Sequence, residues 1–195
     1  MKKKDKETAL NFLNELVSKG LLTNLSSNLF YWRNNNTFSH NFHIGYGLYK
    51  YVFIIDDYDF VIKTNRTSKI GNGCAEEFYM YKQAVKDNME EFFPETDFLT
   101  SIDGHKFYIQ ERADVNEMGV EDSVFEYVSP YFDDEQLARE YVYDDEIEVE
   151  DVLNAVFPKE KAKKVIGWLD KYGIEDIHCG NIGFNNNRPM IIDFS

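Results

Sequence analysis

Two apolar runs separated by a short acidic turn constrain the fold of this chain most. Residues 51–55 read Tyr-Val-Phe-Ile-Ile, and residues 60–63 read Phe-Val-Ile-Lys. The Asp-Asp-Tyr-Asp segment at 56–59 lies between them and is typical of a tight turn. β-Branched and aromatic residues in runs this short favour strands. We therefore expect an antiparallel sheet here, with residues 43–47 as a third strand.

The rest of the chain alternates helical periodicity with short apolar runs. Apolar residues at helical spacing predict helices, and short apolar runs around turn residues predict strands. The expected helices are 6–19, 75–88 with a core face of Phe78, Tyr81 and Val85, and 159–172. The expected hairpins are 97–101 with 106–110 around Asp103-Gly104, and 182–184 with 190–193 around the Asn triplet at 185–187. The Asn triplet at 34–36 predicts a loop. The expected helices and antiparallel strands together indicate an α+β fold.

The negative charge is concentrated in one segment. The formal net charge of the chain is -14, and residues 121–151 contain thirteen Asp or Glu residues against one Arg. An acidic protein repels phosphate backbones and anionic lipid, so we expect neither nucleic acid nor membrane as a partner. Aromatic residues interleave with the acids, which argues against disorder. The segment is therefore interpreted as irregular helices with an acidic outer face.

Cysteine usage and the first residues indicate the compartment. Cys74 and Cys179 form no CxxC pair, so a disulfide framework is not expected and a reducing cytosol is favoured. The basic start, Met-Lys-Lys-Lys, is not followed by the apolar run of a signal peptide. No stretch has the length of a membrane span. The expected location is the cytoplasm, which includes the cytoplasm of a host cell.

The end of the sequence contains three oxygen-bearing side chains at suggestive spacing. Asp193 closes the apolar run Met-Ile-Ile, where a carboxylate is unfavourable unless it is paired or bound to metal. Asn181 and Asp193 flank the final hairpin, so their side chains can converge, and magnesium prefers such hard oxygen ligands. Asp176 stands five residues before Asn181. These are parts that phosphoryl transfer needs: metal ligands and an acceptor for the hydroxyl proton.

These residues resemble the catalytic and metal motifs of the protein-kinase-like superfamily. That family carries Asp-x-x-x-x-Asn, a short hairpin and then Asp-Phe-Gly. The present chain reads Asp-Ile-His-Cys-Gly-Asn at 176–181 and Asp-Phe-Ser at 193–195. The resemblance implies that Asp176 accepts or orients the hydroxyl proton and that Asn181 and Asp193 hold Mg²⁺. The Asp-x-His form is similar to atypical and small-molecule kinases, in which His178 either braces the loop, which we favour, or neutralises the transferred phosphate.

The glycine-bearing segment resembles the nucleotide-covering loop of the same family. Residues 45–52 read Gly-Tyr-Gly-Leu-Tyr-Lys-Tyr-Val, which is similar to Gly-x-Gly-x-x-Gly-x-Val with Lys50 in place of the third glycine. The resemblance implies that Gly45, Gly47 and Val52 lie against ATP. Glycine has no side chain, so the backbone of such a loop can approach phosphates closely.

The strand and helix that follow resemble the phosphate-positioning parts of a kinase. Lys63 ends Phe-Val-Ile-Lys, which is similar to the family's Val-Ala-Ile-Lys, and is implied to contact the α- and β-phosphates. Its expected partner is Glu77, with Glu76 as the alternative, because adjacent helical residues point about 100° apart. Residues 108–113 resemble the strand and hinge that hold adenine through backbone groups, which implies roles for Glu111 and Ala113.

The resemblance implies a two-lobed kinase-like fold with a small antiparallel sheet in the N-terminal lobe. The expected division is a helical extension at 1–40, the N-terminal lobe at 41–113 and a reduced helical C-terminal lobe at 114–195. The sequence ends at Ser195, directly after the Asp-Phe-Ser triplet, where a usual kinase continues with an activation segment. We therefore expect a minimal kinase of the phage or bacterial-effector type, without activation-loop control.

The function expected first is ATP- and Mg²⁺-dependent phosphoryl transfer to a Ser or Thr hydroxyl of a protein substrate. Three alternatives remain open: a catalytically silent pseudokinase, an acidic interaction protein that inhibits a host partner through residues 121–151, and a small-molecule kinase. The site residues also have structural explanations. Asp176 could cap a helix, Lys63 could extend to solvent, and Gly45 and Gly47 could form a plain hairpin turn.

Overall fold

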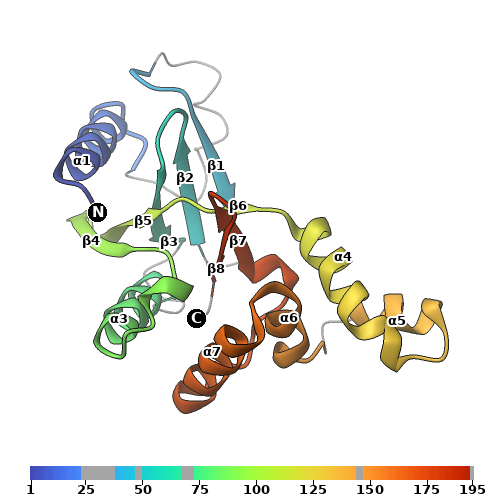
Figure 1. Ribbon diagram of the computed structural model, residues 1–195. Helices are drawn as coiled ribbons and strands as arrows, with labels where there is room; N and C mark the ends of the chain where they lie inside the picture. Colours follow the sequence, from blue (N-terminus) through green and yellow to red (C-terminus); the bar gives the residue numbers. More distant parts are fainter. Residues whose placement is uncertain (23–37, 47–49, 67–72, 144–146, 194–195) are drawn as a thin grey trace. The chain divides into compact units, whose positions relative to one another are not determined.

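The chain, drawn as a ribbon in Figure 1, divides into two compact units. The computed structural model describes residues 1–22, 38–46, 50–66, 73–143 and 147–193. Unit 1 comprises Met1–Gln83 and Glu95–Arg112, and unit 2 comprises Ala84–Pro94 and Ala113–Ser195. Unit 1 contains a sheet with helices and unit 2 is mainly helical, so the α+β class predicted from the sequence is confirmed.

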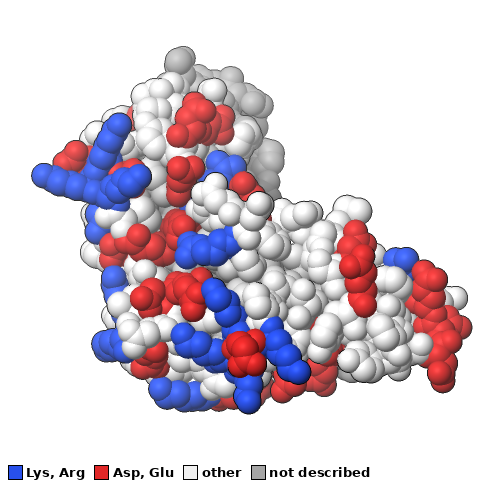
Figure 2. All heavy atoms as spheres, in the orientation of Figure 1, with Lys and Arg blue, Asp and Glu red and all other residues white. Residues whose placement is uncertain are grey.

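The helices of unit 2 include those of the acidic segment, which runs through α4, η2, α5 and the start of α6. The bounds are η1 (Glu90–Phe92), α4 (Glu117–Val128), η2 (Ser129–Tyr131), α5 (Glu135–Val142), α6 (Val149–Val156), α7 (Lys159–Tyr172) and η3 (Cys179–Asn181). Figure 2 shows carboxylates gathered over α5, and the exposed acids of the segment are Asp122, Glu126, Asp133, Asp134, Glu135, Glu140, Glu148 and Glu150. The predicted acidic helices are therefore confirmed, with residues 144–146 outside the described residues.

Residues 84–94 belong to unit 2, although the residues on both sides of them in the sequence belong to unit 1. Phe92 lies 5.5 Å from Phe157 and Phe93 lies 5.0 Å from Trp168, measured between ring centroids. The predicted helix at 159–172 is confirmed by α7, whose buried stripe includes Trp168. At its C-terminal end, the carboxylate of Asp87 accepts hydrogen bonds from Trp168, Lys171 and Tyr172. Residues 84–94 are thereby fastened to α7 by both rings and hydrogen bonds.

Unit 2 ends in a short antiparallel sheet of order β6-β7-β8. Its strands are β6 (Asp114–Val115), β7 (Ile182–Asn185) and β8 (Arg188–Ile191). The β7–β8 turn places Asn186 and Asn187 at φ of 50° and 62°, left-handed values that Asn tolerates well. The final hairpin predicted from the sequence is confirmed. No helix among the described residues is both long and apolar enough to cross a membrane.

Unit 1 is built on a five-stranded antiparallel sheet of order β1-β2-β3-β5-β4. Its strands are β1 (Phe42–Tyr46), β2 (Lys50–Ile55), β3 (Phe60–Asn65), β4 (Thr96–Ile102) and β5 (His105–Glu111). The predicted Asp103-Gly104 turn joins β4 to β5, with φ of 49° and 82°. Left-handed values at both central residues match the right-handed twist of a two-residue hairpin.

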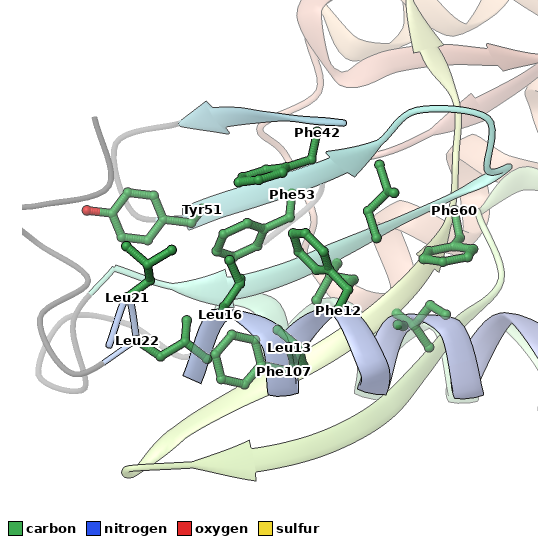
Figure 3. Packing of buried hydrophobic residues seen from close by; sticks show 14 residues of the cluster. Phe12, Leu13, Leu16, Leu21, Leu22, Phe42, Tyr51, Phe53, Phe60 and Phe107 are labelled. Atoms are coloured by element: carbon green, nitrogen blue, oxygen red, sulfur yellow. The ribbon is translucent and has the colours of Figure 1, made fainter. Parts of the chain in front are cut away.

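Helix α1 (Lys3–Ser18) covers one face of this sheet (Figure 3). Side chains alternate between the faces of a strand, so Phe53 points to the same face as Ile55, and Phe107 to the same face as Ile109. Phe12, Leu13 and Leu16 of α1 pack against these residues and are almost completely buried. The ring of Phe12 lies 6.1 Å from that of Phe53 in an edge-on arrangement. One face of the sheet is therefore closed by a helix that precedes it in the chain.

Helix α3 (Gly73–Lys86) covers the opposite face. Its buried stripe follows helical spacing through Cys74, Glu77 and Tyr81, and Cys74 packs against Tyr108 of β5. The predicted core face was wrong at Val85, which is 44% exposed. The stripe is displaced because Glu77, a charged residue, occupies a position that faces the sheet.

Candidate active site

An ion pair is buried between the sheet and α3 in unit 1. Lys63 Nζ lies 2.9 Å from Glu77 Oε2, and the two side chains are 9% and 1% exposed. Lys63 is on β3 opposite Val52 and Tyr108, so its side chain points to the face that α3 covers. Glu76, the preceding residue of the helix, is exposed. The structure thus brings Lys63 together with Glu77 rather than with Glu76.

A second lysine, which sequence reasoning missed as a site residue, shares this carboxylate. Lys50 Nζ lies 2.5 Å from Glu77 Oε1, and its side chain is also 9% exposed. The sequence contained a signal, a lysine at the start of an apolar strand. It was interpreted only as a replacement for a glycine because its partner on α3 is 27 residues away.

Two neutral side chains complete the cluster around Glu77. Gln110 Nε2 donates to Glu77 Oε2 at 3.2 Å and to Thr96 Oγ1 at 3.0 Å. Burial raises the pKa of Glu77, but the ammonium groups of Lys63 and Lys50 and their hydrogen bonds outweigh it, so the pKa is below its usual value. The carboxylate is therefore held ionised and in one orientation.

The glycine-bearing strand borders this cluster. Gly45 lies in β1, opposite Val52 of β2. A Cβ atom at Gly45 would lie 3.8 Å from the Val52 Cβ, an ordinary contact, so packing between these strands does not require glycine. Gly47, expected to cover ATP, lies outside the described residues.

The expected hinge follows β5. Glu111 is the last residue of β5, and its backbone N–H donates to the Glu95 carbonyl at 2.8 Å. Ala113 follows two residues later, where unit 2 begins. Ala113 packs so closely on β7 that a Cβ at Gly183 would come within 2.8 Å of the Ala113 Cβ. Gly183 is therefore required by the close approach of these two segments.

In unit 2, Asn181 and Asp193 lie at the open end of the β7–β8 hairpin, because Asn181 precedes β7 and Asp193 follows β8. The backbone N–H of Ile192 donates to the Asn181 carbonyl at 2.8 Å, which extends the β7–β8 ladder by one pair. Asn181 Nδ2 donates to the Asp193 backbone carbonyl at 2.8 Å, and Asn181 Oδ1 accepts from the His178 N–H at 3.0 Å. The side chain of Asn181 thus fixes the loop before the hairpin to the residue after it.

His178 and Asp176 lie in the loop before η3. His178 Nδ1 accepts from the Gly180 N–H at 3.1 Å, so the imidazole and Asn181 form reciprocal caps on η3. The imidazole of His178 thus makes a contact within the loop, and the bracing role favoured from the sequence stays a prediction. Asp176 is exposed, and the cap of η3 is His178, so Asp176 does not cap that helix.

The donor set of Asn181 and Asp193 fits magnesium. An amide oxygen and a carboxylate are hard ligands, and protein Mg²⁺ sites commonly use one or two such groups with substrate phosphates and water. An amide oxygen has two lone pairs, so Asn181 Oδ1 can accept from His178 and still coordinate a cation. Among the described residues there is no group of three or more His, Cys, Asp or Glu side chains arranged to hold a metal.

Solved structures similar to this chain include two aminoglycoside phosphotransferases. A thermostable mutant of APH(4)-Ia, in a ternary complex with AMP-PNP and hygromycin B, is 15% identical with a TM-score of 0.35. APH(2″)-IIa, in a ternary complex with streptomycin and ATP, is 15% identical with a TM-score of 0.39. Each comparison covers 86% of this chain and 70% of the other.

Neither a protein-family model nor a curated protein sequence matches the chain. At 15% identity and these TM-scores, the likeness carries no conclusion about the function of this chain.

Proposed function

We propose that this protein is an ATP-dependent phosphotransferase. The observation that carries the proposal is a buried ion pair: Lys63, on the sheet that bears Gly45, lies 2.9 Å from Glu77 of α3. A buried ion pair is weak evidence for stability, because well-packed apolar side chains often replace one without loss. Orientation of a lysine toward nucleotide phosphates explains why the sheet carries charge at this position.

Unit 1 is proposed to bind the nucleotide. Lys63, oriented by Glu77, contacts the α- and β-phosphates, and the backbone of Gly45 and Gly47 covers them. Val52 packs against the base. Backbone groups of the hinge at 111–113 hold the adenine edge, which is the proposed role of Glu111 and Ala113. Support comes from the register that sets Val52 and Lys63 opposite one another on one sheet face.

Unit 2 is proposed to supply the residues for transfer. The acceptor hydroxyl oxygen forms a bond to the γ-phosphorus while the bond to the bridging oxygen of ADP breaks, and Asp176 takes the hydroxyl proton. Exposure of Asp176 supports this role, because an acceptor must reach it. Asn181 and Asp193 would hold Mg²⁺, which neutralises charge on the phosphates. His178 positions Asn181 through the loop.

Two acceptors are proposed, in order. The first is a Ser or Thr hydroxyl of a protein. The second is a small polycation, which is favoured by the exposed carboxylates of α4, α5 and α6 (Figure 2). A surface of one sign attracts ligands of the opposite sign and raises their local concentration. The similar phosphotransferases described above, bound to hygromycin B and streptomycin, supply two polycations to test.

The test is transfer of labelled γ-phosphate from ATP with Mg²⁺, using wild type, Asp193→Ala and Asp176→Asn. Acceptors are the protein itself, a mixture of unfolded Ser- and Thr-rich proteins, hygromycin B and streptomycin. The expected result is label in one acceptor with wild type and not with either variant. Binding of ATP without transfer to any acceptor would instead indicate a pseudokinase, and absence of ATP binding would overturn the proposal.

A further inference from the structure

A second lysine shares Glu77 with Lys63, and its place in the sheet gives it a separate role. We propose that Lys50 is a second phosphate-binding residue of the nucleotide site, acting with Lys63 on the polyphosphate of ATP. The inference rests on the proposed function, because it assigns Lys50 to the same site. The proposal gives a phosphate-binding side chain to the position where Lys50 replaces the third glycine of the Gly-x-Gly-x-x-Gly-x-Val motif.

The strand register places Lys50 nearer to the β1–β2 connection than Lys63. Lys50 pairs with Asn65, and Lys63 pairs with Val52, so the two lysines are two positions apart along the ladder. At about 3.4 Å per residue, this offset is roughly 7 Å. The side chains nevertheless converge, since both Nζ atoms lie within 3 Å of a Glu77 oxygen. Lys50 therefore reaches the Glu77 carboxylate from the end of β2 that is nearer to the β1–β2 connection.

The charges of the cluster favour a polyanion. Glu77 carries one negative charge and binds two ammonium groups through its two oxygens. An ammonium group has three donors, so each lysine can bind Glu77 and further acceptors at the same time. The amide of Gln110 also holds the carboxylate and is itself held by Thr96. Glu77 is thus restrained in a position that orients both lysines.

A purely structural role for Lys50 makes a different prediction. If Lys50 only neutralises Glu77, its removal lowers stability and affects ATP only through the orientation of Lys63, so Lys50→Met has no further effect on ATP affinity in the Lys63→Met background. If Lys50 binds phosphate, its removal weakens ATP in both backgrounds and leaves adenosine unchanged, because adenosine lacks phosphates. The effect of Lys50→Met in the Lys63→Met background therefore separates the roles, and an unchanged ATP affinity there would overturn the inference.

The experiment measures binding of ATP with Mg²⁺ and of adenosine by calorimetry. The variants are Lys50→Met, Lys63→Met, the double variant, Lys50→Arg as a charge-retaining rescue, and Lys106→Met as a control at an exposed lysine of β5. Lys50→Met is expected to weaken ATP about 10- to 100-fold, the range for a charge-assisted hydrogen bond, without changing adenosine. Lys50→Arg should recover part of this loss, and the double variant should not prefer ATP to adenosine.

Thermal unfolding of each variant establishes that it is folded under the binding conditions. Equal weakening of ATP and adenosine in Lys50→Met would overturn the inference, as would ATP affinity equal to that of Lys106→Met. These results would leave the proposed function intact if wild type binds ATP. Wild type that binds neither ligand would overturn the proposed function and this inference together.

Discussion

The two parts of the candidate site are held in opposite ways. In unit 1, Glu77 is buried and binds side chains that are 27, 14 and 33 residues away in the sequence. In unit 2, Asn181 and His178 bind backbone groups that are 3, 12 and 2 residues away, beside the exposed Asp176. Tertiary packing therefore builds the first part and local chain geometry builds the second. Stability and function should be coupled at Glu77 in unit 1 and separable at the exposed Asp176 in unit 2.

The largest expected effect on stability is that of Glu77→Ala. The substitution leaves two buried ammonium groups without their shared carboxylate. Breaking a buried ion pair typically lowers the free energy of unfolding by about 3–5 kcal/mol. Glu76→Ala, one residue earlier and exposed, should change it by less than about 0.5 kcal/mol. Urea denaturation of both variants is the measurement, and equal midpoints would contradict the coupling of stability to the unit 1 cluster.

Asp176→Asn should separate function from stability. Loss of the proton acceptor is expected to slow phosphoryl transfer by about 10²- to 10⁴-fold. Because Asp176 is exposed, the free energy of unfolding should change by less than about 0.5 kcal/mol. Single-turnover kinetics measures the rate of transfer, and urea denaturation measures the free energy of unfolding. A variant that transfers phosphate as fast as wild type would remove Asp176 from the reaction.

Asn181→Ala should lower both the rate of phosphoryl transfer and the free energy of unfolding, although its effect on stability is smaller than that of Glu77→Ala. The substitution removes the bonds to the His178 N–H and the Asp193 carbonyl. These bonds are part-buried, so the loss should be below the ~1–3 kcal/mol that fully buried unsatisfied groups cost. The readouts are those used for Asp176→Asn, which serves as the matched variant in the same loop. Unchanged stability would show that the loop is held by contacts other than this side chain.

The smallest expected effect concerns Asp87, a carboxylate of unit 2 that takes no part in the site. Hydrogen bonds from Tyr172 and Lys171 lower its pKa to about 2. Because the folded-state pKa is below the unfolded one, its stabilisation is complete above the usual Asp pKa and is lost as pH falls toward 2. Thermal midpoints of wild type and Asp87→Asn should therefore differ near neutral pH and converge toward pH 2. A difference that stays constant across this range would contradict the assignment.

Local sequence patterns predicted the hairpins and helices whose ends carry turn-forming residues such as Asp, Asn and Gly. The Asp103-Gly104 and Asn186–Asn187 turns adopt left-handed backbone values at both central residues, which is why these residue types indicated hairpins. Helix α7 has the bounds that periodicity gave it. Asn181 and Asp193 were placed at one end of a hairpin by the same local reasoning, and backbone pairing puts them there.

The buried cluster could be predicted only in part. Lys63 and Glu77 were paired by resemblance, whereas Lys50 and Gln110 were not identified. Their contacts depend on which sheet face α3 covers and on the β2–β3 register, neither of which follows from a single strand. Val85 was misplaced for the same reason, because a charged Glu77 on the buried stripe contradicts the usual apolar pattern.

Helix α1 has a consequence for how the protein is made. Its apolar stripe of Phe12, Leu13 and Leu16 is buried against β5 residues such as Phe107 and Ile109. During translation these partners emerge roughly 5–20 s after the helix, at typical elongation rates. For that interval the stripe has only the residues of the earlier strands, such as Phe53, to pack against, and the part that contacts β5 is exposed. Slow elongation between α1 and β5 should therefore increase capture by chaperones, and placing α1 after β5 by circular permutation should reduce it.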